Sequence, residues 1–134
     1  MKNLLKKIPA LSYIAKYVYR VYQQPFQGSK LYWEKRYETG GHSGDGSYNK
    51  LAEFKAEVLN KFVADNKIKT IIEFGCGDGN QLSLAQYPSY IGFDISKVVI
   101  TNCTSMFRHD NTKTFKLMDE YNGEKSQLAL SLYP

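Results

Sequence analysis

The spacing of apolar residues along the chain changes from a helical period to short apolar runs and back, which predicts helices that alternate with strands. Between residues 48 and 64, apolar side chains recur three and four positions apart, with lysines and glutamates between them. This pattern predicts a long helix whose apolar side covers one face of a sheet. The residues on that side are Leu51, Phe54, Val58, Leu59 and Phe62.

Short apolar segments elsewhere predict strands, and the polar or glycine-containing stretches after them predict turns. Ser96 follows the second such segment and is a candidate N-cap for a helix that runs to residue 107. Strands separated by helices favour an α/β fold with a parallel sheet. The four predicted strands are 71–74, 90–94, 114–118 and 127–132.

The N-terminal part of the chain predicts one more helix. Pro9 suits the first helical position, and an apolar stripe at helical spacing follows it. We expect this helix to pack on its own domain; docking to a membrane surface or a partner, or a role as a lid, is the alternative. Residues 1–30 thus form an N-terminal amphipathic helix and linker, and 31–134 form one domain. The stripe consists of Leu11, Ile14, Ala15, Val18 and Tyr22.

Residues 71–80 are the segment around which the other predictions are arranged. An apolar strand ends near Glu73 and passes into three glycines spaced two apart, Gly75, Gly77 and Gly79. Glycine adopts positive φ without strain and lets a ligand approach the backbone closely. With a helix expected from Gln81, the segment is a strand–glycine loop–helix unit of the nucleotide-binding kind.

The charge of this loop distinguishes among the nucleotides that it could hold. The Lys and the Ser or Thr of a Walker loop are absent at the required spacing, and the third glycine comes one residue early for the dinucleotide fingerprint. Glu73 and Asp78 bring two carboxylates to the loop. Carboxylates repel a pyrophosphate but attract the ammonium and sulfonium of S-adenosylmethionine (SAM), so the sequence favours SAM as the cofactor.

Asp94 ends the second predicted strand, 21 positions after Glu73 (94 − 73). An acidic residue at this place in a doubly wound sheet accepts hydrogen bonds from ribose hydroxyls, in NAD sites as well. Asp94 therefore indicates an adenosine ribose, but it does not distinguish SAM from NAD.

Through these two segments the chain resembles the class I SAM-dependent methyltransferases. The glycine motif at 73–79 and the acidic second-strand motif at 91–96 carry the resemblance, and a looser similarity extends from about residue 32 to 132. It implies an incomplete Rossmann-like sheet of about four parallel strands in the order 3-2-1-4, with an N-terminal helical extension. The family's sheet has seven strands, and the three absent units correspond to roughly 90 residues. We therefore expect a C-terminally truncated methyltransferase, the cofactor-binding half, which could be inactive.

The resemblance also assigns contacts to the cofactor. Glu73 would orient the amino end of SAM, Asp94 the ribose, and the glycine backbone the methionine moiety. Asp119, just after the third strand, would accept a hydrogen bond from the adenine amino group; the alternative is a solvated acid in a turn.

A segment before the core has a W-x-x-x-Y pattern that related enzymes use to close over the cofactor. Arg36 could clamp the methionyl carboxylate, and an aromatic ring could lie near the sulfonium. The alternative is a short helix whose aromatic residues only pack. The glycine-rich loop that follows, 40–47, is typical of a mobile lid. All candidate cofactor-binding residues are Trp33, Arg36, Tyr37, Glu73, Gly75, Cys76, Gly77, Gly79, Asn80, Asp94, Ile95 and Asp119.

Composition narrows the function classes. A hydrophobic fraction of 43% is that of an ordinary globular domain, and the net charge of +5 comes without a basic stripe in the core, so nucleic acid is a less favoured partner than a small molecule. Cys76 and Cys103 are expected to be free thiols in a reducing compartment, without zinc-ligand spacing. Apolar stretches fall short of the about 20 residues of a membrane span, and a secretory signal is not indicated, so we expect a cytoplasmic protein of unspecified oligomeric state.

The sequence thus predicts a SAM-dependent methyltransferase with an unidentified, small-molecule acceptor and no recognisable catalytic base. Two alternatives stay open. One is an NAD-type oxidoreductase domain, and the other is a non-catalytic SAM-binding or interaction fragment that uses its amphipathic N-terminus.

Overall fold

The computed structural model describes residues 28–132, so the expected N-terminal helix lies outside the described residues. Contacts between residues divide the chain into two units, Met1–Tyr32 and Trp33–Pro134. Of the first unit, only 28–32 are described; they contain the first turn of helix α2 (Ser29–Glu38), where the Tyr32 amide donates to the Gly28 carbonyl at 3.2 Å. The sheet and the glycine loop belong to the second unit.

The second unit is built on a parallel sheet of four strands. Their order is β3-β2-β1-β4, which confirms the predicted α/β class and the predicted strand order. All four strands begin within one residue of the prediction, but β4 ends two residues early, because only three of its residues pair with β1. The strands are β1 (Thr70–Phe74), β2 (Ser89–Asp94), β3 (Lys113–Leu117) and β4 (Leu128–Leu130).

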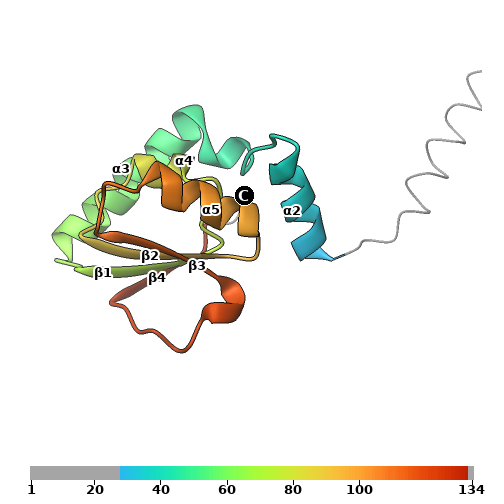
Figure 1. Cartoon of the computed structure of the whole chain (residues 1–134). Coiled ribbons are helices and arrows are strands. Elements are labelled where there is room, and N and C mark those ends of the chain that lie inside the picture. The colour runs from blue at the N-terminus through green and yellow to red at the C-terminus, as the bar shows by residue number, and fades with distance from the viewer. Residues whose placement is uncertain (1–27, 133–134) are drawn as a thin grey trace, which may run out of the picture. The chain divides into compact units, whose positions relative to one another are not determined.

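Helices α3 (Asn49–Asp65), α4 (Asn80–Ser83) and α5 (Lys97–Met106) lie over one face of the sheet, and the connection from β3 to β4 runs across the other (Figure 1). That connection contains the 3₁₀ turn η3 (Met118–Glu120) and Tyr121, whose ring packs edge-on against Phe74 and Phe93 at 5.3 Å from each. None of the helices between residues 28 and 132 is long and apolar enough to cross a membrane.

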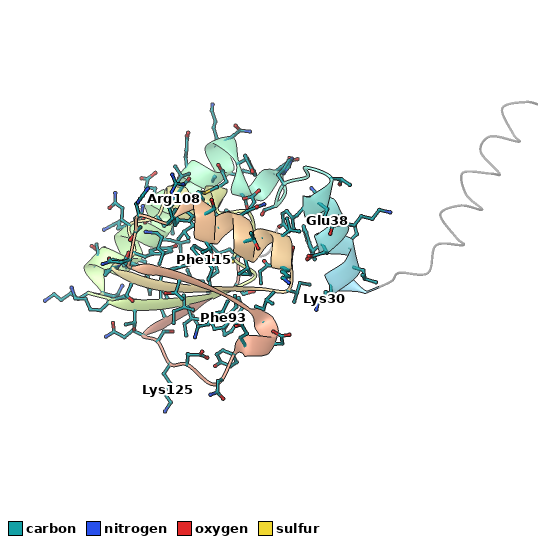
Figure 2. All side chains as sticks on the ribbon, viewed as in Figure 1. Lys30, Glu38, Phe93, Arg108, Phe115 and Lys125 are labelled. Atoms are coloured by element: carbon teal, nitrogen blue, oxygen red, sulfur yellow. The ribbon has the colours of Figure 1, made fainter. Side chains whose placement is uncertain are left out.

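The core fills the space between the sheet and the helices. Phe115 points toward α5, where it stacks on Phe107, whereas Phe93 lies on the opposite face (Figure 2). Helix α5 starts as predicted, because the Ser96 hydroxyl accepts a hydrogen bond from the Val99 amide at 3.3 Å. In the main core cluster, four side chains are at most 1% exposed: Ile71, Tyr90, Val99 and Cys103.

Helix α3 turns a different side to the core from the predicted one, and that prediction is wrong. Its buried residues are Ala52, Ala56 and Val63, and of the predicted apolar side only Leu59 packs against the core. Small residues let α3 lie close to α4, where the Gln81 side chain donates to the Ala52 carbonyl at 3.0 Å. The other members of the predicted side are 46–63% exposed: Leu51, Phe54, Val58 and Phe62.

One acidic side chain is enclosed in this core. The Glu73 carboxylate accepts a 2.6 Å hydrogen bond from the Tyr90 hydroxyl, and Glu73 is only 5% exposed. Burial raises the pKa of Glu73 to about 7; the Tyr90 hydrogen bond and the charge of Lys55 act in the lowering direction, and Asp94 in the raising direction. Glu73 therefore titrates near neutrality, inside the protein.

The burial of α3 predicts which substitutions on it are costly. Val63→Ala should lower the free energy of unfolding by about 2 kcal/mol, because the side chain is 3% exposed and leaves a cavity. Phe54→Ala should lower it by less than about 1 kcal/mol, because Phe54 is 63% exposed. Urea denaturation of both variants measures the difference, and a larger loss for Phe54→Ala would contradict the observed orientation of α3.

The Glu73 environment predicts a specific pH dependence of stability. Because the folded-state pKa is raised from 4.5 to about 7, the contribution of Glu73 is fully present below pH 4.5 and is lost as pH rises through 7. Glu73→Gln keeps an acceptor for Tyr90 and removes the titration. Relative to the unaltered protein, it should gain up to about 3 kcal/mol of stability between pH 4.5 and 8. Denaturation at several pH values tests this, and a parallel pH profile for the two proteins would contradict it.

Candidate functional site

The carboxyl ends of three neighbouring strands meet at one edge of the sheet. Phe74 lies opposite Phe93 in the β1–β2 pair, and Asp94 lies opposite Leu117 in the β2–β3 pair. The residues that leave the sheet next, Gly75, Ile95 and Met118, therefore start within one residue of the same level. Ligands of open α/β sheets bind at this edge.

The glycine loop occupies this edge in the conformation that its sequence predicts. Gly75 and Gly77 have φ values of 80° and 64°, in the left-handed region that favours glycine. A Cβ atom added to Gly75 would meet nothing within 4 Å, whereas one added to Gly77 would lie 2.4 Å from the Ser43 hydroxyl oxygen. The loop is thus open at Gly75 and covered by protein at Gly77.

Asp94 joins the end of β2 to this loop. Its Oδ2 accepts a hydrogen bond from the Gly77 amide at 3.1 Å, and its Oδ1 accepts one from the Ser96 amide at 3.0 Å. The residue is 7% exposed, and burial raises the pKa of its carboxyl, while the bonds from these amides and from the Ile95 amide act in the lowering direction. Asp94 and the glycine loop, which the sequence assigns to one cofactor, are therefore in direct contact.

Residues 42–48 cover the other side of the loop. The Ser43 amide and the Tyr48 hydroxyl both donate to Oδ2 of Asp78, at 2.9 and 2.6 Å, and the Asn80 side chain donates to the Ser47 carbonyl at 2.5 Å. Ser43 and Ser47 are buried. The glycine-rich segment was predicted to be a mobile lid; the structure instead shows a packed connection, because its polar groups find partners on the glycine loop.

The W-x-x-x-Y segment forms part of helix α2. The Trp33 and Tyr37 rings stack at 5.7 Å, and the Arg36 guanidinium lies over the Trp33 ring at 5.6 Å while its Nε donates to the His42 carbonyl at 2.7 Å. The Tyr37 hydroxyl lies 3.0 Å from the Ser43 hydroxyl. Burial raises the pKa of Tyr37 to about 12, and the carboxylates of Asp94 and Asp78 act in the same direction.

The remaining candidates surround these groups. Cys76 and Cys103 are buried free thiols, and the hydrogen bond that the Cys76 thiol donates to Cys103, together with burial, raises the pKa of Cys76. Gly79 is the N-cap residue of α4, and Asn80 begins that helix. Asp119 is exposed in η3, two residues past the β2–β3 pairing of Asp94 with Leu117.

The structure thus brings most of the predicted residues to one edge of the sheet. Two carboxylates that were expected to face the ligand instead form hydrogen bonds within the protein. Glu73 is bonded to Tyr90 in the core, and Asp78 is bonded to the 42–48 segment, so both carboxylates have protein partners. Ser43 and Tyr48 were not predicted, although their position in a loop dense in glycine and serine was a usable signal. Among residues 28–132, no group of three or more His, Cys, Asp or Glu side chains could hold a metal ion.

A separate hollow of about 280 Å³ lies where α5 ends and β3 begins, lined in part by Phe107, Arg108 and Lys113. It is at the amino end of β3, since Lys113 is the first residue of that strand. Because the glycine loop and Asp94 are at the opposite ends of the strands, the hollow is not part of the candidate site.

Comparisons with known proteins place this arrangement among known folds. No protein-family model matches the chain, and no curated protein sequence matches it. Its structure is similar to that of a methyltransferase from Podospora anserina bound to S-adenosylhomocysteine (SAH), with a TM-score of 0.53 and 13% identity over 92% of this chain and 58% of that chain. It is also similar to magnesium protoporphyrin IX methyltransferase from Synechocystis PCC 6803 with bound SAH, with a TM-score of 0.50 and 20% identity over 87% of this chain and 57% of that chain.

The chain spans less than three fifths of the length of either protein. At this identity the likeness concerns the fold. The strand order, the glycine loop after β1 and the carboxylate at the end of β2 agree with it. The chain therefore has the Rossmann-like fold of the class I SAM-dependent methyltransferases, represented by four parallel strands in the order β3-β2-β1-β4.

Proposed function

We propose that this chain binds SAM at the carboxyl ends of β1, β2 and β3 and serves a methyltransferase. One observation supports this most directly. The Asp94 carboxylate, anchored to the Gly77 amide, lies beside a loop whose Gly75 leaves open space where any other residue would place a Cβ atom. This combination fits a ligand with ribose hydroxyls that also approaches the backbone closely.

Different residues around this edge are proposed to contact different parts of SAM. Asp94 accepts from the ribose hydroxyls, and Ile95 and Asp119 adjoin the adenine. The loop backbone from Gly75 to Asn80, with Cys76 within it, follows the methionine moiety. On α2, Trp33, Arg36 and Tyr37 are the proposed contacts from outside the loop, and the Tyr37 hydroxyl lies 3.0 Å from the Ser43 hydroxyl that contacts the loop. Glu73, which the structure encloses with Tyr90, supports the loop from the core rather than contacting the ligand.

For methyl transfer, the main contribution of the protein is to align the methyl acceptor with the methyl donor. SAM supplies a methyl group on a sulfonium with a neutral thioether as leaving group, and an enzyme contributes the orientation of the acceptor and a dry site. In this chain the amide-anchored Asp94 would fix the ribose end, and the 42–48 segment holds the loop through hydrogen bonds to Asp78. We infer a small-molecule acceptor and assign no general base.

Calorimetric titration with SAH tests the proposal. The unaltered protein should bind SAH, and Gly75→Ala should weaken binding at least tenfold, because its Cβ would enter the space proposed for the ligand. Gly123→Ala is the matched control: both glycines have φ near 75–80° and neither Cβ would meet protein atoms within 4 Å, so both variants carry a similar backbone strain of about 1–2 kcal/mol.

Titration of the same proteins with NADH separates the alternatives. Binding of NADH but not SAH by the folded, unaltered protein would replace the proposal with an NAD-type domain. Equal SAH affinity in the Gly75 and Gly123 variants would place the ligand elsewhere. SAH binding without methyl transfer from labelled SAM to small-molecule acceptors would favour a non-catalytic binding fragment.

A further inference from the structure

The Asp78 side chain connects three parts of the site. Its Oδ2 accepts hydrogen bonds from the Ser43 amide and the Tyr48 hydroxyl, and its Oδ1 accepts one from the Asn80 amide at 3.1 Å. One carboxylate therefore holds the 42–48 segment, the glycine loop and the first turn of α4 in a fixed arrangement.

The contact between Ser43 and Asp78 is reciprocal. While the Ser43 amide donates to the Asp78 side chain, the Asp78 amide donates to the Ser43 hydroxyl oxygen at 2.7 Å. Two hydrogen bonds in opposite directions between the same two residues fix their relative orientation as well as their distance. The Tyr37 hydroxyl, 3.0 Å from the same Ser43 oxygen, adds a third group from α2.

Ser43 also lies directly against the loop backbone. Its hydroxyl oxygen would be 2.4 Å from a Cβ atom on Gly77, the residue whose amide donates to Asp94. Displacement of Ser43 would therefore release Gly77, the loop residue that is hydrogen-bonded to the carboxylate proposed to hold the ribose. We call Ser43, Tyr48 and Asp78 the latch.

The latch depends on neutral donors to a carboxylate. None of the ion pairs found among residues 28–132 includes Asp78. Burial and the Asp78 carboxylate raise the pKa of Tyr48, so its hydroxyl keeps its proton and remains a donor across neutral pH. Hydrogen bonds to charged groups are stronger than neutral ones, so the loss of one donor should loosen the loop measurably.

We propose that Ser43, Tyr48 and Asp78 are positioning residues that hold the glycine loop for the amino-acid end of the cofactor. The inference rests on the proposed function, in which the ribose lies at Asp94 and the methionine moiety follows the loop from Gly75 to Asn80. A loosened latch should therefore weaken the binding of a ligand that has an amino-acid end more than that of one without it.

Two ligands and paired variants test this role. SAH carries the amino-acid end and 5′-methylthioadenosine lacks it, while both share the adenosine. In Tyr48→Phe, which removes one charge-assisted hydrogen bond to Asp78, the Kd of SAH measured by calorimetry should rise about tenfold. In Ser43→Ala, which keeps the amide donor to Asp78 and removes only the hydroxyl that accepts from the Asp78 amide, it should rise about fivefold, close to one neutral hydrogen bond. In both variants the Kd of methylthioadenosine should rise less than about twofold. Ser43→Thr, which keeps the hydroxyl, should restore much of the SAH affinity.

Tyr121→Phe is the matched control, since it removes a tyrosine hydroxyl that donates to the Glu124 carbonyl in the β3–β4 connection at 3.4 Å. It should change neither Kd. A general loss of folded protein lowers the apparent affinity for both ligands equally, so only the ratio of the two constants reports positioning.

The outcomes are distinguishable. An unchanged ratio in folded latch variants, with SAH still bound by the unaltered protein, would overturn the latch and leave the proposed function standing. Binding of neither ligand by the unaltered protein would overturn both. If Ser43→Ala does not fold, Tyr48→Phe decides, because it removes a single oxygen and retains the ring that packs on His42.

Discussion

The hydrogen bond from the Gly77 amide to the Asp94 carboxylate joins the turn after β1 to the end of β2. It is made possible by the parallel register, in which the two strands end within one residue of each other, and by the positive φ of the glycines in the turn. In the described residues backbone amides, not a cation, satisfy this carboxylate. Asp94 and the conformation of the glycine loop therefore form one structural unit, and a change in one should alter the other.

The sequence was sufficient for the elements that local patterns encode. Strands buried on both faces are short apolar runs, and the glycine spacing specifies a turn with positive φ, so both could be located from consecutive residues. The order of the strands came from the resemblance that these two motifs carry, and the sheet agrees with it. Asp94 could be assigned to the loop because its place in this fold is set by strand topology rather than by side-chain packing.

Contacts between distant segments could not be predicted in this way. The amphipathic pattern of α3 identifies an apolar side, but which side meets the core depends on the neighbouring helix. Ala52 and Ala56 allow that approach, and the polar bonds to α4 fix it. Likewise, glycine content suggested that residues 40–47 are mobile, whereas the bonds from Ser43 and Tyr48 reach Asp78 across 35 and 30 positions in the sequence. Such bonds have no local signature.

The same long-range contacts change the electrostatic argument for the cofactor. Glu73 and Asp78 were expected to present their charges to the ligand and thereby to repel a pyrophosphate. In the structure one is enclosed with Tyr90, with a pKa raised to about 7, and the other is satisfied by three donors within the protein. Selectivity for the proposed adenosyl ligand would then depend on shape and on Asp94, because a carboxylate held by amides suits neutral ribose hydroxyls. Under the proposed function, discrimination against a dinucleotide would depend on how firmly Asp78 holds the loop, and therefore on the packing of residues 42–48 against it.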